Sequence, residues 1–382
     1  MNASLSRWLI LLISFCSSSA TWGQPFPDAR RAPPTGWTGH VFKLSQDYPG
    51  TLPSKQVPWE SFNFRTQPEQ YMRAIMNYAL EGNLGVDWDV DRNPVRKWYH
   101  TPWMHRGDSP REFVRGLTKE RSSRSRELHP QQTGSVENWA VGFYNPRGGY
   151  TLGKVWLTGG VPDATKARFR SGAVAVKLLF TKATDAQVPF LHGTFEWQAD
   201  TENNPNNLQT VRLLQVDIAV RDTRNSSRTG WVFGTFIYNG DAPGNTPWER
   251  LVPVGLMWGN DPTVTPSAVQ SGQAQIVQSW INPSARSVMQ HYGWAGRLNG
   301  PVDNPMSSCL SCHSAAQLPA ARMLPPANST ESQRLKWFRN IKAGSPFDPG
   351  AQSLDYSLQL SVGIQNYLES LPRVSRDEGP SQ

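Results

Sequence analysis

The chain has 382 residues, a formal net charge of +8 and only three cysteines. Its length predicts more than one domain, and so few cysteines exclude a disulfide-rich scaffold. No apolar run is long enough to cross a bilayer, so the protein is not expected to span a membrane.

The first 23 residues have the layout of a secretory signal peptide. Arg7 is their only charge, residues 8–15 are apolar, and the small residues Ser18 and Ala20 precede a cleavage point after Ala20 or Gly23. We therefore expect an exported protein, periplasmic or secreted. Residues 24–67 are rich in Pro, Gly and aromatics without periodicity, and we expect an extended arm.

A helix is predicted over residues 68–81, because proline begins it, apolar residues recur at helical spacing, and Gly82 follows. A basic segment, residues 92–126, comes next, with ten Lys or Arg against three acidic residues. The simplest interpretation is a solvated loop packed on a sheet. A second is a docking surface for an acidic redox partner. A third is a pocket in which His100, His105 and Arg106 bind a small anionic substrate or act in acid–base catalysis. Nucleic acid is not expected as a partner of an exported protein.

Between residues 138 and 280 the apolar residues alternate with other residues. The alternation is clear over 174–180, 214–220, 231–237 and 252–258, and turn-rich segments separate these runs. Short alternating strands with polar turns predict an antiparallel β-sandwich or barrel.

The strongest motif is Cys309-Leu-Ser-Cys312-His313, the C-x-x-C-H signature of covalent c-type haem attachment. On a helix, positions i, i+3 and i+4 share one face, so both thiols can reach the haem vinyl groups while His313 ligates the iron. Asn304 and Pro305 predict the start of this helix. A zinc site or a redox dithiol would use the same C-x-x-C, but zinc needs further ligands that this region lacks.

Cysteine usage agrees with one covalent haem c. Once the signal peptide is removed, Cys309 and Cys312 are the only cysteines, and both lie inside the motif. No thiol is left for a disulfide, a type-1 copper centre or an iron–sulfur cluster.

Two more helices are predicted after the motif, over residues 330–343 and 354–371. In its size and in Cys309, Cys312 and His313, the last quarter of the chain resembles a class I bacterial cytochrome c. The resemblance implies a small all-α haem domain. We thus predict an α+β chain of two domains: an antiparallel β-sandwich-like domain over residues 68–285, then an all-α cytochrome c domain over residues 286–382.

Such cytochromes place a methionine on the far side of the iron. Here the candidate is Met323, although it follows the motif more closely than the family pattern has it. The alternatives are an open sixth position, or a distant histidine such as His100, His105 or His291. A Met/His pair suits electron transfer, whereas an open position suits small-molecule binding.

We therefore expect a monohaem cytochrome that transfers single electrons, with the β-rich region docking a partner or a substrate. The alternative is a haem-dependent oxidoreductase or a sensor with an open iron position.

Overall fold

The structure is a computed structural model that describes residues 26–55, 57–105, 109–156 and 161–372. The predicted signal peptide, residues 1–23, lies outside the described residues. Before the first helix, the described part of the arm contains one short 3-10 helix (Pro58–Ser61) and an isolated bridge between Arg30 and Arg111.

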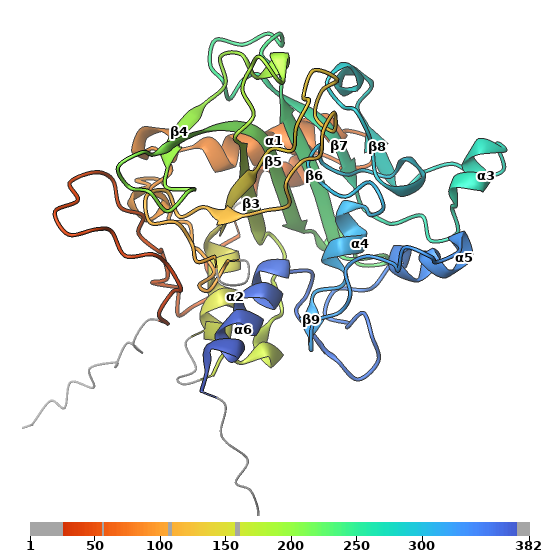
Figure 1. The fold of residues 1–382 in the computed structure, drawn as a ribbon. Coiled ribbons are helices and arrows are strands. Elements are labelled where there is room, and N and C mark those ends of the chain that lie inside the picture. Colours follow the sequence, from red (N-terminus) through yellow and green to blue (C-terminus); the bar gives the residue numbers. More distant parts are fainter. Residues whose placement is uncertain (1–25, 56, 106–108, 157–160, 373–382) are drawn as a thin grey trace, which may run out of the picture.

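An eight-stranded antiparallel sheet is the centre of the fold (Figure 1). Its order is β1-β2-β3-β5-β6-β7-β8, with β4 paired to β5. The strands are β1 (Thr118–Lys119), β2 (Asn138–Tyr144), β3 (Val174–Thr181), β4 (Glu196–Ala199), β5 (Gln209–Arg221), β6 (Trp231–Tyr238), β7 (Leu251–Met257) and β8 (Ser279–Ile281). A separate pair joins β9 (Gln317–Leu318) to β10 (Gln352–Ser353). Period-two alternation therefore located the main strands correctly.

The helices are short, and they lie on both sides of the sheet. They are α1 (Pro68–Leu80), α2 (Pro146–Trp156), α3 (Pro266–Gln270), α4 (Cys309–His313), α5 (Glu331–Arg334) and α6 (Leu358–Ser370). Helix α1 packs on one face, where a Cβ placed at Gly234 of β6 would come 3.1 Å from Met72 Cε. Helix α4 lies on the other face, with the His313 ring 4.5 Å from the ring of Phe233.

The predicted α1 is confirmed within one residue, and the apolar positions that predicted it are buried: Tyr71, Met72, Ile75, Met76 and Ala79. Helix α2 was not predicted, because three of its eleven residues are glycines, which are poor helix formers. Two of them are required by close packing: a Cβ at Gly148 would come 2.7 Å from Tyr144, and one at Gly149 would come 2.3 Å from Tyr99.

The predicted fold class is wrong. The described residues form one large sheet and a separate two-stranded pair, not a sandwich, and the C-terminal quarter is not an all-α cytochrome c domain. The helix predicted over 330–343 is only the four-residue α5 followed by a 3-10 turn, Leu335–Phe338, although the predicted capping box of Thr330 and Gln333 is present. The helix predicted over 354–371 begins later, at Leu358.

The physical reason for this error is burial against the sheet. Leu298, Leu310, Leu354 and Leu360 belong to the same hydrophobic cluster as the strands, so the core runs without a break across residue 286. A segment that buries its apolar side chains on a neighbouring sheet does not need three packed helices of its own. None of the helices in the described ranges is both long and apolar enough to cross a membrane.

Candidate haem site

Helix α4 is held firmly at its first turn. Ser308 caps it, its side chain accepting a hydrogen bond from Ser311 N while the Ser311 hydroxyl accepts one from Ser308 N. The Ser308 hydroxyl also donates to Asn260 Oδ1 at 2.8 Å, and Leu310 is fully buried. The cap predicted at Asn304 is therefore wrong, and the helix begins four residues later than Pro305. Leu310 and Ser311 are buried, whereas Cys309, Cys312 and His313 are partly exposed.

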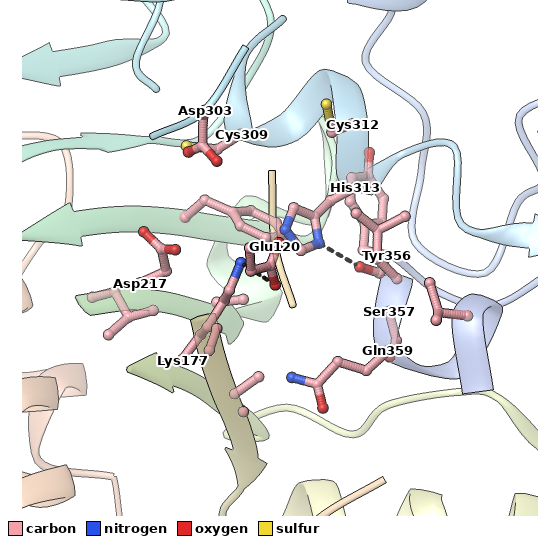
Figure 2. Close-up of a pocket in the computed structure, with 18 of the residues that line it drawn as sticks. Glu120, Lys177, Asp217, Asp303, Cys309, Cys312, His313, Tyr356, Ser357 and Gln359 are labelled. Atoms are coloured by element: carbon pink, nitrogen blue, oxygen red, sulfur yellow. Dashed lines mark hydrogen bonds and ion pairs between the residues drawn. The ribbon is translucent and has the colours of Figure 1, made fainter. Parts of the chain in front are cut away.

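Cys309, Cys312 and His313 line one cavity of about 380 Å³ between α4, α6 and the sheet (Figure 2). The sheet side of the cavity comes from β2, β3, β5 and β6, and the opposite side includes residues 356–359 at the start of α6. This volume falls in the range of sites for large organic ligands and cofactors. The motif therefore opens onto a ligand-sized space, not onto solvent or solid core.

His313 is oriented as an iron ligand should be. Its Nδ1 lies 2.9 Å from the backbone oxygen of Tyr356, and a carbonyl oxygen can only accept, so the ring proton sits on Nδ1. This bond fixes the tautomer that leaves Nε2 free to bind a metal. Burial lowers the pKa of His313 to about 4, so the imidazole is neutral at physiological pH. Figure 2 shows the other ring nitrogen directed away from Tyr356 and toward Lys177 and Glu120.

The carbonyl that holds His313 depends on an unusual backbone. Asp355 and Tyr356 have φ angles of +49° and +69°, two successive non-glycine residues in the left-handed region. Such conformations cost on the order of 1–3 kcal/mol each and persist where surrounding contacts enforce them. Here the Asp355 carboxylate accepts from Phe169 N at 2.7 Å and from Gly344 N at 3.0 Å, while the Tyr356 hydroxyl donates to Ile341 O.

The two thiols are poorly suited to thiolate chemistry. Burial raises the pKa of Cys312 to about 11, and burial together with the carboxylates of Asp303 and Asp217 raises that of Cys309 well above its ordinary value. Redox dithiols and zinc sites depend on the deprotonated form. Protonated thiols beside a neutral imidazole are compatible with covalent attachment to a cofactor.

Part of the sheet side of the cavity is built from small side chains. Ala175 of β3 pairs with Ala219 of β5, and Ala140 and Gly142 of β2 continue the same face. A Cβ at Gly142 would come 2.1 Å from Gln359 Nε2, so glycine makes room here. The Oε1 atom of Gln359 is buried and has no hydrogen-bond partner. A buried polar atom without a partner, on the wall of a cavity, is expected where a ligand or a water molecule supplies the missing hydrogen bond.

A row of polar side chains crosses this same sheet face. Lys177, Asp217 and Thr235 are direct cross-strand neighbours on β3, β5 and β6. Lys177 Nζ lies 3.0 Å from Glu120, and Asp217 accepts from the Thr235 hydroxyl at 2.6 Å and from Gln215 Nε2 at 2.7 Å. Burial and the nearby Asp303 raise the pKa of Asp217 to about 6. Burial alone would lower the pKa of Lys177, but the three surrounding carboxylates outweigh it and raise that pKa.

Sequence reasoning missed this row and Tyr356. Lys177 and Asp217 alternate with apolar residues in their strands, which is the pattern of side chains that face water. The sheet is covered on both faces at this point, so these positions face a cavity instead. Tyr356 acts through its backbone oxygen, and such a role leaves no signature in the sequence.

The candidates for the sixth iron ligand lie in different environments. Met323 lines the cavity that holds His313, although 46% of its surface is exposed, and Met104 lines it as well. Among the described residues that line the cavity, no histidine other than His313 is present. His100 is buried elsewhere with Nδ1 accepting from Ser45 N, and His291 lies 3.8 Å from Glu127.

A small-substrate pocket was predicted at His100, His105 and Arg106. Arg106 lies outside the described residues. Burial lowers the pKa of both histidines, that of His100 strongly, so both are neutral at physiological pH. His100 packs against Phe42, with the ring centroids 4.9 Å apart, and is a core residue in its contacts.

The basic segment 92–126 is largely neutralised by acidic residues from elsewhere. Seven of the nine basic side chains that the structure describes in this segment form ion pairs: Arg92–Asp89, Arg96–Glu81, Lys97–Asp47, Arg111–Asp28, Arg115–Asp87, Lys119–Glu137 and Arg121–Glu127. These ion pairs are the contacts expected from the simplest interpretation, in which the basic segment is a loop packed on the sheet. Docking of an acidic partner at this segment stays a prediction.

The residues of the cavity fit a covalently bound haem: two thiols at i and i+3, a neutral imidazole with its Nε2 free, and a floor of small side chains. Within the described residues, no group of three or more His, Cys, Asp or Glu is arranged to hold a metal ion. A haem iron takes most of its ligands from the porphyrin, so one histidine can anchor it.

Comparison of the chain with protein-family models, with curated proteins and with solved structures finds no match. The resemblance to class I cytochromes c therefore rests on Cys309, Cys312 and His313 and does not extend to the fold.

Proposed function

We propose that this chain is an exported c-type cytochrome that carries one haem in the cavity between α4, α6 and the sheet. Cys309 and Cys312 would attach the haem, and His313 would ligate its iron. The observation that carries the proposal is the hydrogen bond from His313 Nδ1 to the Tyr356 carbonyl, in a cavity that both thiols also line. A cysteine pair with a purely structural role would not need a neighbouring histidine oriented in this way.

The chemistry that a bound haem supplies is the one-electron Fe(III)/Fe(II) couple. The protein's part is to hold the ligand, exclude water and tune the potential. The Tyr356 carbonyl raises the basicity of His313, which favours the ferric state. Burial against the sheet disfavours the extra charge of the ferric state. The carboxylates of Asp217 and Asp303 oppose that effect.

The sheet forms one wall of this site, so its role is to build the haem cavity. We retain an acidic redox protein as the proposed partner, and Met323 as the proposed sixth ligand. Export rests on the first 23 residues.

A second function, reaction of a small molecule at an open iron position, is favoured by one observation. Lys177, Glu120 and Asp217 place two carboxylates and an ammonium, all partly buried, on the cavity wall, and titratable groups gathered in a cleft are typical of a reactive site. In this function the row would bind a polar ligand and supply protons to it.

Spectroscopy and potentiometry of the mature protein, produced with haem-maturation machinery, test the proposal. We expect a reversible one-electron wave and a ferrous haem that does not bind CO, because Met323 occupies the sixth position. Rapid CO binding to the ferrous haem, together with a high-spin ferric haem, would contradict electron transfer and favour the second function. Absence of any redox-active haem would refute both.

A further inference from the structure

A second, smaller cavity of about 190 Å³ lies outside the haem site, where β5 ends. Three arginines line it, namely Arg168, Arg170 and Arg221, together with Asp355 and the backbone around Gly344. Three guanidinium groups against one carboxylate leave a net charge of +2 in a space that suits a small ion. This composition differs from that of the haem cavity, which is mostly apolar.

The arginines of this cavity lack the acidic partners that other basic residues have. In the described parts of the chain, Arg168, Arg170 and Arg221 form no ion pair with a carboxylate. Arg147 is nearby, and its pKa is lowered by burial and also by the charge of Arg170. Three guanidinium groups and one carboxylate thus share this cavity, and the excess of positive charge attracts anions.

The backbone at Gly230 holds the Arg221 guanidinium in place. Its Nη1 donates to Gly230 O at 2.5 Å, and a Cβ at Gly230, whose φ is +78°, would come 2.4 Å from that nitrogen. Its Nε is buried and has no hydrogen-bond partner. A fixed guanidinium with an unused N–H is the group that recognises oxyanions through paired hydrogen bonds.

The single carboxylate of the cavity is already satisfied. Asp355 accepts from Phe169 N, from Gly344 N and from Trp231 Nε1, at 2.7, 3.0 and 3.1 Å. Burial also raises its pKa, so its charge opposes an incoming anion less than a free carboxylate would.

We propose that the cavity of Arg168, Arg170 and Arg221 is a binding site for a small tetrahedral oxyanion of the phosphate class. The site is independent of haem attachment, because it shares no thiol or iron ligand with the haem cavity. The arginine cavity nevertheless adjoins the haem cavity through Asp355. This residue directly precedes Tyr356, whose carbonyl oxygen accepts the hydrogen bond from His313.

Calorimetric titration of the mature haem-loaded protein with inorganic phosphate, at constant ionic strength set by chloride, tests this site. The variant is Arg168→Gln/Arg170→Gln, which changes two exposed side chains and should not disturb folding. The matched control is Arg124→Gln/Arg126→Gln, which removes the same charge from two exposed arginines that form no ion pair among the described residues. A third variant, Arg221→Lys, keeps the positive charge but removes the guanidinium group that can donate paired hydrogen bonds to an oxyanion.

We expect saturable phosphate binding to the wild type and to the control, and at least a tenfold weaker affinity in the double variant. Arg221→Lys should also bind more weakly if it keeps the wild-type circular dichroism. The proposal is overturned if the wild type shows no phosphate-specific binding, or if the double variant and the control lose affinity equally. The latter would mean that net charge, and not this cavity, attracts the anion.

Discussion

The position of His313 in the motif could be read from the sequence, but the orientation of its ring could not. Its place after Cys312 was enough to predict an iron ligand, because the attachment chemistry fixes that spacing. Its orientation depends on the Tyr356 carbonyl, 43 residues away along the chain. It also depends on the left-handed backbone at Asp355 and Tyr356, which the residue types at these positions do not predict. Lys177 and Asp217 were hidden for a different reason: an alternating strand looks the same whether its polar face meets water or a cavity.

Asp217 makes the stability of the protein depend on pH. Its pKa is about 6 in the fold against 3.8 ordinarily, so the folded state binds the proton more tightly. Ionisation of Asp217 therefore lowers the free energy of unfolding. This loss is absent below pH 3.8, grows as the pH rises toward 6, and reaches its full value above pH 6. Asp217→Asn cannot ionise and can still accept from Thr235. It should stabilise the protein at pH 7 by at most about 3 kcal/mol and by much less near pH 4.

Denaturant unfolding at several pH values measures this difference. Asp185→Asn, at an exposed turn, is the control and should show no such growth with pH. A constant effect of Asp217→Asn from pH 4 to pH 7 would mean that this carboxyl has no raised pKa.

At the scale of elements, the sequence located α1 and the main strands correctly, because each has a clear apolar period. It failed for α2, whose glycines are chosen by packing against Tyr99 and Tyr144, and for the C-terminal helices, whose apolar faces are covered by the sheet. Sequence spacing gives the candidates for an element but not the surface that it packs against.

The loop that carries Met323 brings a sulfur to the haem cavity. If this sulfur is the sixth ligand, as we propose, Met323→Ala removes the far-red methionine-to-iron band, lowers the reduction potential and turns ferric haem high-spin. Met104→Ala is the matched control, since Met104 lines the same cavity. Optical spectra of the two ferric variants decide the point. Loss of the band in Met104→Ala alone would assign the ligand to the segment before β1 instead.

If the cavity holds haem, as we propose, the small side chains of β2, β3 and β5 must leave room for a flat cofactor. Ala219→Leu extends a branched side chain from the floor into the cavity and should remove most of the covalently bound haem, while the protein remains folded by circular dichroism. Ala219→Ser keeps the floor low and should retain haem. Haem content per protein, from the pyridine haemochrome, gives the answer. Full haem content in Ala219→Leu would place the cofactor away from this floor.

For the whole molecule, the main correction is that the haem motif and the sheet share one core. Leu298, Leu310, Leu354 and Leu360 are fully buried in the cluster that the strands form. Burial of each such side chain is worth about 1.5–3 kcal/mol. Separation from the sheet would thus remove most of the 5–15 kcal/mol (roughly) that stabilises a typical domain. Composition and length suggested two domains because neither reports on contacts between distant segments.

A fragment of residues 286–372 should therefore fail to fold alone. We expect it to show no cooperative thermal transition and to keep no haem when exported beside the maturation machinery, whereas residues 24–372 do both. Circular dichroism and haem staining compare the two. A folded, red fragment would show that residues 286–372 are a domain that folds without the sheet.

The most direct test of the account is the linkage between haem and protein. The mature chain, produced in a host that attaches haem c, is extracted with acidic acetone and its intact mass is measured. We predict that one haem remains bound to the wild type, and that none remains in Cys309→Ala/Cys312→Ala. Extraction of all the pigment from the wild type, or a colourless wild-type protein, would contradict the account.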